Sequence, residues 1–414
     1  MRLLVVSQHY WPENFRVTDL VSGLVSEGVE VDVLCGLPNY PKGEWFEGYD
    51  AHGPFDEVHE GVRLYRCREV PRLGNTSVRI FLNYVSWPLS ARFNLRRLEG
   101  GYDAVMCFNT SPVLMIWPAI AASRKFKAPL TSYVLDLWPE NLYSVLPVDN
   151  VLLRAVAQAV SNWHYMNSDR VIALSDGMLE NIVSRVGVKN GWRCVEKCKQ
   201  YSVIPHYCED FYAAKEASSQ HNEAGNFVLT FAGNLSPAQD LPNVFEAVKL
   251  VNESLDLVSG TTFRLEIYGD GMARESLVDQ VIEMGLEDIV LFKGVVSPED
   301  VPSVLGKADA LLVSLIDSPD LGLTIPGKLA SCMASRKPLI VSITGAGADA
   351  ARESGGALVN NAGDIEGLAV NILTLMSLSC DERKELGDRS FAYYERNYSR
   401  SVVISRIKEF VLGS

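Results

Sequence analysis

Lys328 stands in a short segment whose residue types suit an anionic ligand. The segment reads TIPGK from Thr324 to Lys328 and follows ADALLVSLI, an apolar run typical of a buried strand. Proline is favoured in the first turn of a helix, threonine can cap that turn, and Gly327 leaves the backbone bare. A lysine at a helix N-terminus costs about 0.3–1 kcal/mol unless it faces an anion there. The segment therefore predicts a phosphate-like ligand at a helix start, with a solvated surface lysine as the alternative.

Two glycine-bearing turns follow strand-like runs in the second half of the chain. Gly233 comes after FVLTFA and precedes NLSPAQDL and an apolar-periodic helix, whose free N–H groups would suit a phosphate. An ordinary strand-to-helix turn would look the same. Gly269 and Gly271 flank Asp270 at the end of LEIY, but the third glycine of the dinucleotide fingerprint is missing. A nicotinamide cofactor, and with it a dehydrogenase, is therefore disfavoured.

Carboxylates in the first half stand directly after strand-like runs. Glu13 lies in SQHYWPENFR after RLLVV, and Asp136 and Glu140 lie in LDLWPEN after PLTSYV. Acid–base groups are expected at the carboxyl edge of a buried parallel sheet. The structural alternative for Asp136 is a capping role ahead of Pro139. Six histidines show no metal-ligand spacing, and His9, in the first strand-to-helix loop, is the one expected near a ligand.

A basic and aromatic segment spans Arg72–Leu98. It contains no acidic residue, although the chain carries 51 of them and a net charge of −13. Basic and aromatic side chains at helical spacing suit an anionic membrane surface, and a core helix with a solvated basic face is the alternative. The residues expected to face a membrane are Arg79, Trp87, Arg92, Arg96 and Arg97.

Composition excludes several classes of protein. An acidic balance argues against a general nucleic-acid binder. The eight cysteines are scattered, and CVEKC from Cys194 to Cys198 has no close second pair, so free thiols are expected and no metal. No apolar run approaches the roughly 20 residues that span a bilayer, and the N-terminus reads as a strand without a secretory signal. We expect a cytoplasmic protein.

Strand-like and helix-like segments alternate along nearly the whole chain. The strand-like runs are short, rich in Val, Leu and Ile, and not strictly alternating, which is typical of parallel strands buried on both faces. A polar stretch at Ala213–Asn226 interrupts the series and reads as a linker. The 414 residues therefore predict an α/β fold of two Rossmann-like domains facing a cleft, lined by the loops after the strands.

Taken together, these motifs resemble the GT-B glycosyltransferases. FAGNLSPAQDL, YGDG and the C-terminal helix resemble family 4, the retaining enzymes that use nucleotide-sugar donors. SQHYWPENFR, GLPNYPKGE, DLWPEN and LTIPGK are similar to a subgroup from bacterial surface-polysaccharide clusters, including the N-acetyl-L-fucosamine transferases of O-antigen assembly. The resemblance covers essentially the whole chain. It implies an acceptor-binding domain at 1–208, a donor-binding domain at 209–390 and a final helix at 391–414 that packs back on the first domain.

The resemblance also implies roles for individual residues. The donor would be bound by Gly233, Asn234, Gln239, Tyr268, Gly269, Asp270, Gly271, Thr324, Ile325, Pro326, Gly327, Lys328 and Ser331. The acceptor would be bound by His9, Asn14, Arg16, Asn39, Tyr40 and Glu140, with Glu13, Asp136 and Lys328 as catalytic residues. Implied partners are a nucleotide-sugar, UDP-linked, and a sugar on a polyprenyl diphosphate at the inner face of the cytoplasmic membrane, met peripherally. No cofactor is implied.

Departures from the family pattern bear on the mechanism. Two glutamates usual in the family are Leu323 and Ser331 here, a usual glycine is Arg336, and the Arg and Lys of the motif after the linker correspond to Asn234 and Gln239. Lys328 and backbone N–H groups would then stabilise the leaving diphosphate without a metal. Since a carboxylate beside the sugar carbon is missing, we expect front-face attack helped by Asp136 or Glu13. A sugar-nucleotide 2-epimerase and a non-enzymatic module that keeps the fold are the alternatives.

Overall fold

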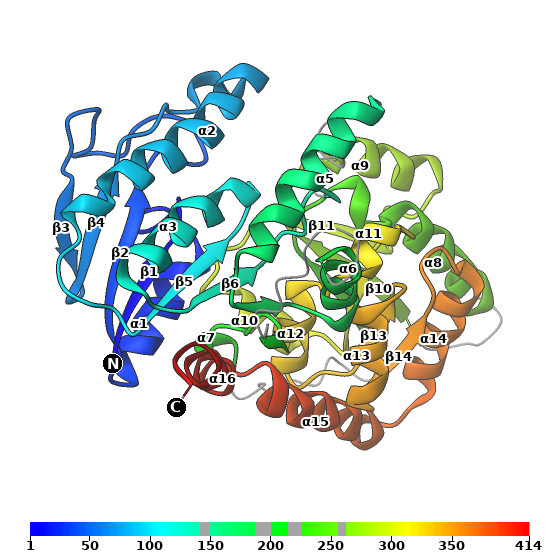
Figure 1. Ribbon diagram of the computed structural model, residues 1–414. Coiled ribbons are helices and arrows are strands. Elements are labelled where there is room, and N and C mark those ends of the chain that lie inside the picture. Colours follow the sequence, from blue (N-terminus) through cyan, green and yellow to red (C-terminus); the bar gives the residue numbers. More distant parts are fainter. Residues whose placement is uncertain (141–149, 187–199, 214–225, 256–261, 414) are drawn as a thin grey trace. The chain divides into compact units, whose positions relative to one another are not determined.

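The computed structural model describes residues 1–140, 150–186, 200–213, 226–255 and 262–413, and Figure 1 shows its ribbon. The chain forms two compact units. One consists of residues 1–204 with 404–414, and the other of residues 205–403.

An eight-stranded sheet forms the first unit. Its strand order is β3-β4-β2-β1-β5-β6-β7-β8, with the edge strand β3 antiparallel to β4 and the other neighbours parallel. Apolar side chains fill both faces of the central strands, so that β5 is buried along its whole length. The strands are β1 (Arg2–Val6), β2 (Glu30–Gly36), β3 (Asp56–His59), β4 (Val62–Cys67), β5 (Ala104–Asn109), β6 (Leu130–Val134), β7 (Arg170–Ala173) and β8 (Gln200–Val203).

The helices of the first unit lie on opposite faces of this sheet. Because parallel crossovers are right-handed, the helix that links β1 to β2 lies on the face opposite to the helix that links β5 to β6. Thr76 caps α2 and Asn150 caps α5, each through its side-chain oxygen. The helices are α1 (Arg16–Ser26), α2 (Ser77–Asn94), α3 (Ile116–Phe126), α5 (Val151–Met166), α6 (Asp176–Val186) and α16 (Arg400–Leu412), with 3-10 turns η1 (Leu73–Asn75), η2 (Leu95–Arg97) and η3 (Val113–Met115).

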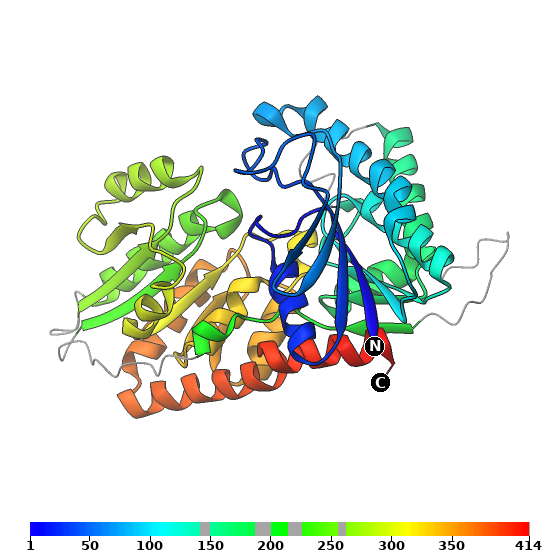
Figure 2. The ribbon, with the colours of Figure 1, turned by 90° about the vertical axis from the view of Figure 1, so that its left-hand side faces the viewer.

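The final helix, α16, returns to the first unit, as predicted. Its apolar positions Val403, Ile404, Ile407 and Val411 are buried. Arg406 donates to the Val203 carbonyl at 2.8 Å. The two termini lie close together in this unit (Figure 2). The chain passes to the second unit after residue 204 and leaves it after residue 403, whereas the sequence suggested 208 and 390.

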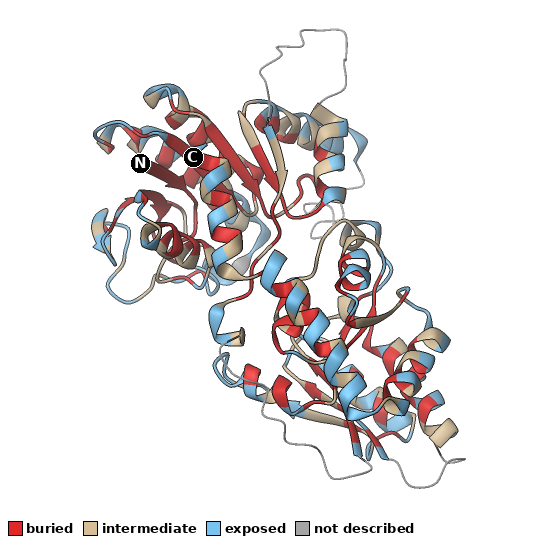
Figure 3. Cartoon of the chain, turned by 90° about the horizontal axis from the view of Figure 1, so that it is seen from below, coloured by how far each residue is buried: buried red, intermediate tan, exposed pale blue. Residues whose placement is uncertain are grey.

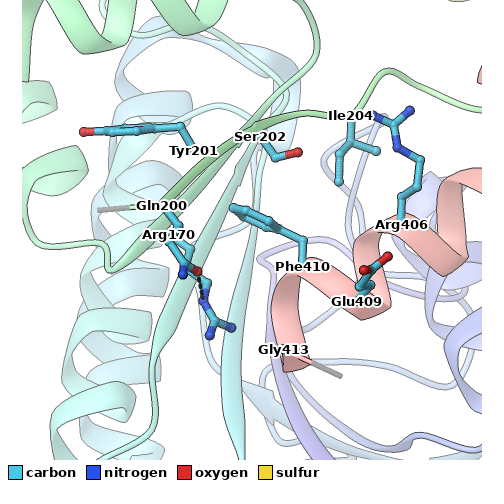
Figure 4. A pocket seen from close by; sticks show the side chains of 9 residues that line it. All are labelled: Arg170, Gln200, Tyr201, Ser202, Ile204, Arg406, Glu409, Phe410 and Gly413. Carbon is cyan, nitrogen blue, oxygen red and sulfur yellow. Dashed lines mark hydrogen bonds between the residues drawn. The ribbon is translucent and has the colours of Figure 1, made fainter. Parts of the chain in front are cut away.

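A cavity of about 800 Å³ lies between α16 and the strands β7 and β8 (Figure 4). Arg170 donates to both Gln200 and the Val411 carbonyl beside it. None of the predicted site residues lines this cavity. Its lining residues are Arg170, Gln200, Tyr201, Ser202, Ile204, Arg406, Glu409, Phe410 and Gly413.

A six-stranded parallel sheet of order β11-β10-β9-β12-β13-β14 forms the second unit. One apolar cluster on it takes residues from α8, α9 and α14, and another takes residues from α12, α13 and α15. Figure 3 shows the buried strands and the half-buried helices. Its elements are α7 (Asp210–Ala213), β9 (Asn226–Ala232), η4 (Pro237–Gln239), α8 (Leu241–Leu255), β10 (Thr262–Tyr268), α9 (Arg274–Glu283), β11 (Val290–Gly294), α10 (Val301–Lys307), β12 (Ala310–Ser314), α11 (Pro319–Gly322), α12 (Gly327–Ala334), β13 (Leu339–Ser342), α13 (Ala346–Ser354), β14 (Ala357–Asn360), α14 (Ile365–Ser377) and α15 (Cys380–Asn397).

Candidate functional site

Helix α12 begins at Gly327, one residue after Pro326, as the sequence suggested. The predicted cap is wrong, however. Thr324 donates its hydroxyl hydrogen to the Leu321 carbonyl at 3.1 Å, and Pro326 occupies the cap position without a side-chain bond. The short helix α11 directly precedes Thr324, and its last carbonyls need donors. The first N–H groups of α12 therefore keep no side-chain partner at the cap.

The Lys328 ammonium points inward to the end of β9 rather than into solvent. It donates a hydrogen bond to Gln239 Oε1 and lies 4.1 Å from the centroid of the Phe231 ring. A side chain at Gly233 would place its Cβ 3.0 Å from this ammonium. Burial lowers the pKa of Lys328 from 10.5 to about 8. Lys328 of α12 thus meets Gly233 and Gln239 of the turn after β9, although the two segments lie far apart in the sequence.

The glycines of the neighbouring turns are required by the packing of one loop on the other. Gly269 has φ 135°, and a Cβ there would come within 1.9 Å of the Gly233 carbonyl oxygen. A Cβ at Gly271 would approach the Leu235 carbonyl oxygen to 2.3 Å. The backbone N–H of Leu235 donates to the Asp270 carbonyl at 2.9 Å, which fixes the two turns together. This contact is the structural reason for both glycines, whatever they bind.

Other predicted donor residues are engaged locally. Tyr268 donates to Glu266 at 2.8 Å, and this carboxylate together with burial raises the pKa of Tyr268 to about 12. Ser331 donates to the Lys328 carbonyl at 2.9 Å, one turn back in α12. Asn234 and Asp270 are exposed, and Ile325 is half-buried.

Arg336 now has a structural explanation. It adopts φ 54° just after α12, a left-handed conformation that glycine takes at no steric cost. Its guanidinium lies 4.0 Å from the Phe391 ring centroid and 3.7 Å from the Asp388 carboxylate. These contacts hold the arginine where the family pattern has glycine.

In the first unit, Glu13 is buried and fully engaged. Its Oε1 accepts the backbone N–H groups of Asn39 and Tyr40, each at 2.7 Å. Its Oε2 lies 2.7 Å from His9 Nδ1, and the His9 ring stacks on Phe15 at 4.5 Å. Glu13 therefore ties the loop after β1 to the loop after β2. Its side chain is 2% exposed, which argues against the predicted role as a base.

Asn39 is also fully buried, so its side chain holds the loop rather than facing outward. It donates to Glu69 and to the Leu37 carbonyl. Glu69 accepts a second bond from Gln8 Nε2 at 2.7 Å. Burial, with Glu13 nearby, raises the pKa of Glu69 well above 4.5. The carboxyl is therefore neutral over a wider pH range than an exposed glutamate.

Asn83 and Arg72 extend this buried polar network. Asn83 Oδ1 accepts from Gln8 Nε2 at 2.9 Å and from Arg72 Nε at 3.0 Å. The Arg72 guanidinium lies 5.2 Å from the Tyr40 ring centroid and 5.0 Å from the Tyr84 ring centroid.

Gln8, Glu69 and Asn83 were missed as site residues, and Arg72 was assigned only to the basic segment. The rule that pointed to Glu13, a carboxylate after a strand-like run, would have found Glu69 as well.

Asp136 and Glu140 are held by partners in the first unit. Asp136 Oδ2 accepts from the backbone N–H and from the hydroxyl of Ser111, both at 2.9 Å. These two bonds tie the loop after β6 to Ser111, which follows β5. Glu140 lies 3.3 Å from Arg185. Asn14 is exposed, and Arg16 begins α1.

The predicted membrane-facing residues divide into two groups. Trp87 is completely buried, so its assignment to a membrane surface is wrong. Arg97 is also better explained inside the unit, since it donates to the carbonyls of Phe55 and Arg66 and pairs with Asp56 at 2.7 Å. Arg79, Arg92 and Arg96 are exposed.

Within the described ranges, no group of three or more His, Cys, Asp and Glu side chains could hold a metal ion. Cys194 and Cys198 lie outside those ranges. No helix in the described part of the chain is both long and apolar enough to cross a bilayer.

Comparisons with known proteins agree with this architecture. Residues 14–195 match the model of a glycosyl transferase 4-like domain, and residues 226–377 match that of glycosyl transferases group 1. No curated protein sequence matches the chain.

Solved structures share the fold at low sequence identity. A sucrose-phosphate synthase from Thermosynechococcus elongatus has 16% identity and a TM-score of 0.70, covering 99% of this chain and 97% of that one. HepE of Anabaena, solved with UDP and glucose, has 14% identity and a TM-score of 0.63, covering 99% and 98%. WaaG, a glycosyltransferase of lipopolysaccharide biosynthesis, has 13% identity and a TM-score of 0.64 over 100% of both chains. Two parallel-sheet α/β domains of the GT-B type are thereby confirmed.

Proposed function

We propose that this chain, which matches a glycosyl transferase 4-like domain and a glycosyl transferases group 1 domain, moves a sugar from a UDP-linked donor to a lipid-linked acceptor. The donor sugar is a hexose derivative such as N-acetyl-L-fucosamine. The acceptor is a sugar on a polyprenyl diphosphate, and the product enters a bacterial O-antigen or capsule. The observation that carries the donor side is the inward-pointing Lys328 ammonium beside Gly233.

Lys328 supplies a cation at the place where the motif after the linker lacks one. Gln239 stands where the family pattern has a basic residue, and the Lys328 ammonium bonds to its side-chain oxygen. A positive charge buried without a carboxylate gains most when an anion binds beside it. The diphosphate of the donor is such an anion. HepE, which shares the fold, was solved with UDP.

The reaction needs charge stabilisation on the leaving nucleoside diphosphate more than it needs a strong acid. Lys328 and the first N–H groups of α12, which have no side-chain cap, provide it, and no metal is assigned to this step. We assign Asp136 to the acceptor hydroxyl, because it is half-buried, whereas Glu13 is almost completely buried and bonds to two backbone N–H groups and His9. The attack is from the front face of the sugar.

The acceptor side is formed by the loops after β1, β2 and β6 in the first unit. Tyr40 is partly exposed, and Asn14 is exposed. A polyprenyl-linked acceptor places the chain peripherally at the cytoplasmic face of the membrane.

A thermal shift with UDP, GDP and ADP tests the donor side, followed by a screen of sugar nucleotides against a polyprenyl-diphosphate-linked sugar. We expect UDP to stabilise the protein and one sugar nucleotide to be turned over. The rise in melting temperature caused by UDP should disappear in the Lys328→Gln variant. It should remain in Lys307→Gln, a change at an exposed lysine. Stabilisation without turnover on any lipid acceptor would favour a non-enzymatic module, and C2 inversion of the free donor would favour an epimerase.

A further inference from the structure

Three helices of the first unit contain no acidic residue. The chain has 51 Asp and Glu among 414 residues, yet none lies in α2, α3 or α5. The same helices and the turns that follow them carry Arg79, Arg92, Arg96, Arg97, Arg124, Lys125, Lys127 and Arg154. Three helices with basic and no acidic side chains are a marked local departure from the composition of a chain with net charge −13.

These helices belong to one layer. α2 packs against α3, and both α2 and α5 contact the turn η3. Their crossovers all run in the same direction along the sheet, from β4 to β5, from β5 to β6 and from β6 to β7, so they lie on the same face. Figures 1 and 2 show α2 and α5 in this layer.

The outer side of the layer is apolar as well as basic. Large apolar side chains are exposed at five positions of α2 and six of α5. A soluble protein seldom gathers so many exposed apolar side chains on neighbouring helices without a partner. They are Val78, Phe81, Leu82, Leu89 and Phe93 on α2, and Val151, Leu152, Leu153, Val156, Trp163 and Met166 on α5.

Helix α5 carries a continuous exposed stripe. Leu152, Val156, Ala159, Trp163 and Met166 follow one another at spacings of four, three, four and three residues, and all are exposed. This spacing places them on one side of a helix. In an ordinary surface helix such a stripe faces the core, whereas here it faces outward.

We propose that the outer side of α2 and α5 binds the surface of an anionic lipid bilayer. The stripe of α5 enters the boundary between headgroups and acyl chains, and Arg79, Arg92 and Arg96 meet lipid phosphates. Arg96 already lies 3.8 Å from the Phe93 ring centroid, an arrangement that keeps an aromatic ring and a cation together at an interface. The inference deepens the peripheral association given under the proposed function, but its surface argument does not depend on the donor.

Charge decides between a bilayer and a second copy of this chain. A two-fold interface through α2 and α5 would bring the three exposed arginines of one copy against those of the other, with no acidic side chain in either helix. Anionic phosphates match the charge, and acyl chains match the stripe.

The experiment is flotation of the full chain with phosphatidylcholine vesicles that contain phosphatidylglycerol. The triple variant R79Q/R92Q/R96Q should lose about 100-fold in affinity, since each arginine contributes about fivefold near such a surface. L152Q/V156Q should lose about tenfold or more. Control variants with the same chemical changes at exposed sites of the second unit, R264Q/R274Q/R396Q and I282Q/V370Q, should bind as the wild type does. Quenching of tryptophan fluorescence by brominated acyl chains should fall in Trp163→Phe.

Several results would overturn the inference. One is vesicle binding whose affinity does not depend on the content of phosphatidylglycerol. Another is equal loss in the control variants, and a third is self-association in solution that L152Q/V156Q abolishes while no variant affects vesicles. Far-UV circular dichroism and a thermal melt without ligand, measured on every variant, show that each is folded. Vesicle binding that persists in a protein unable to bind UDP would contradict the proposed function and leave this surface supported.

Discussion

Lys328 Nζ donates a hydrogen bond to Gln239 Oε1, although 89 positions separate the two residues in the chain. The lysine comes from the first turn of α12, and the glutamine from the turn η4 after β9. The family pattern carries a cation in that turn, and this chain carries one beside it. The pair therefore places a positive charge at the end of β9.

Exchanging the two side chains tests whether the position of the charge matters more than its origin. Lys328→Gln should lower kcat/KM for the donor by about 10²–10³-fold, the range seen when one charge-stabilising donor is removed. K328Q/Q239K should recover at least a tenth of the wild-type value, because the ammonium returns to the same hydrogen bond from the other side. Donor kinetics at saturating acceptor provide the measurement. A double variant no better than K328Q would show that the helix α12 itself, rather than the charge, is needed.

The pH dependence of UDP binding should follow the titration of Lys328. Because burial lowers its pKa to about 8, the free protein loses the ammonium as the pH rises through that value. The affinity for UDP should be constant below about pH 7.5 and then fall by about tenfold per pH unit. Titration calorimetry from pH 6 to 10 would record this change in affinity. The Lys328→Gln variant should bind UDP weakly, and its affinity should show no change of slope near pH 8. A break that persists in the glutamine variant would belong to another group.

Restoring the two absent glutamates should not improve the enzyme. Ser331 lies three residues after Lys328 on α12, so a carboxylate there would compete with phosphate for the ammonium. L323E/S331E should therefore raise KM for the donor about threefold or more, measured with the donor identified in the screen. A rise in kcat in this variant would mean that the family's carboxylate contacts are still accommodated.

Glu13→Ala should act on stability and on the acceptor rather than on the donor. Two buried backbone N–H groups, those of Asn39 and Tyr40, would lose their acceptor, at a cost of about 2–4 kcal/mol in the free energy of unfolding. Urea unfolding would measure this loss of stability. KM for the acceptor should rise, whereas the rise in melting temperature caused by UDP should not change. Full stability with complete loss of turnover would instead make Glu13 the catalytic base.

Glu69 should make the protein less stable as the pH rises. Its folded-state pKa lies above its ordinary value of 4.5, so the folded protein holds a proton that the unfolded chain has released. The free energy of unfolding should decline from about pH 4.5 upward through the folded pKa. Glu69→Gln should flatten this slope, because a glutamine does not titrate and its side-chain oxygen can still accept from Gln8 Nε2. Denaturant midpoints from pH 5 to 9 decide the matter, with Glu353→Gln, at a carboxylate far along the chain, as the reference.

How far the sequence predicted this molecule depends on the range of the interaction. Strands such as β1 and β5 can be predicted from their aliphatic composition. The start of α12 at Gly327-Lys328 can be predicted from the residues that favour a helix N-terminus. The network of Gln8, Glu69 and Asn83 could not be read in this way, because its partners lie 61 and 75 residues apart. Trp87 was misplaced because the amphipathicity of α2 is weak and composition alone does not say which side faces the sheet.

The return of α16 has a consequence for how the protein is made. The second unit is one uninterrupted stretch of chain, residues 205–403, set into a first unit that is completed by residues 404–414. During synthesis the first unit is therefore completed only after residues 404–414 have been made, and Arg170 and the Val203 carbonyl lack their partners on α16 until then. A nascent chain stalled before residue 404 would carry a complete second unit and an unfinished first one. For the same reason a fragment ending at 204 is a poor minimal domain, because it lacks the part of α16 that completes the first unit.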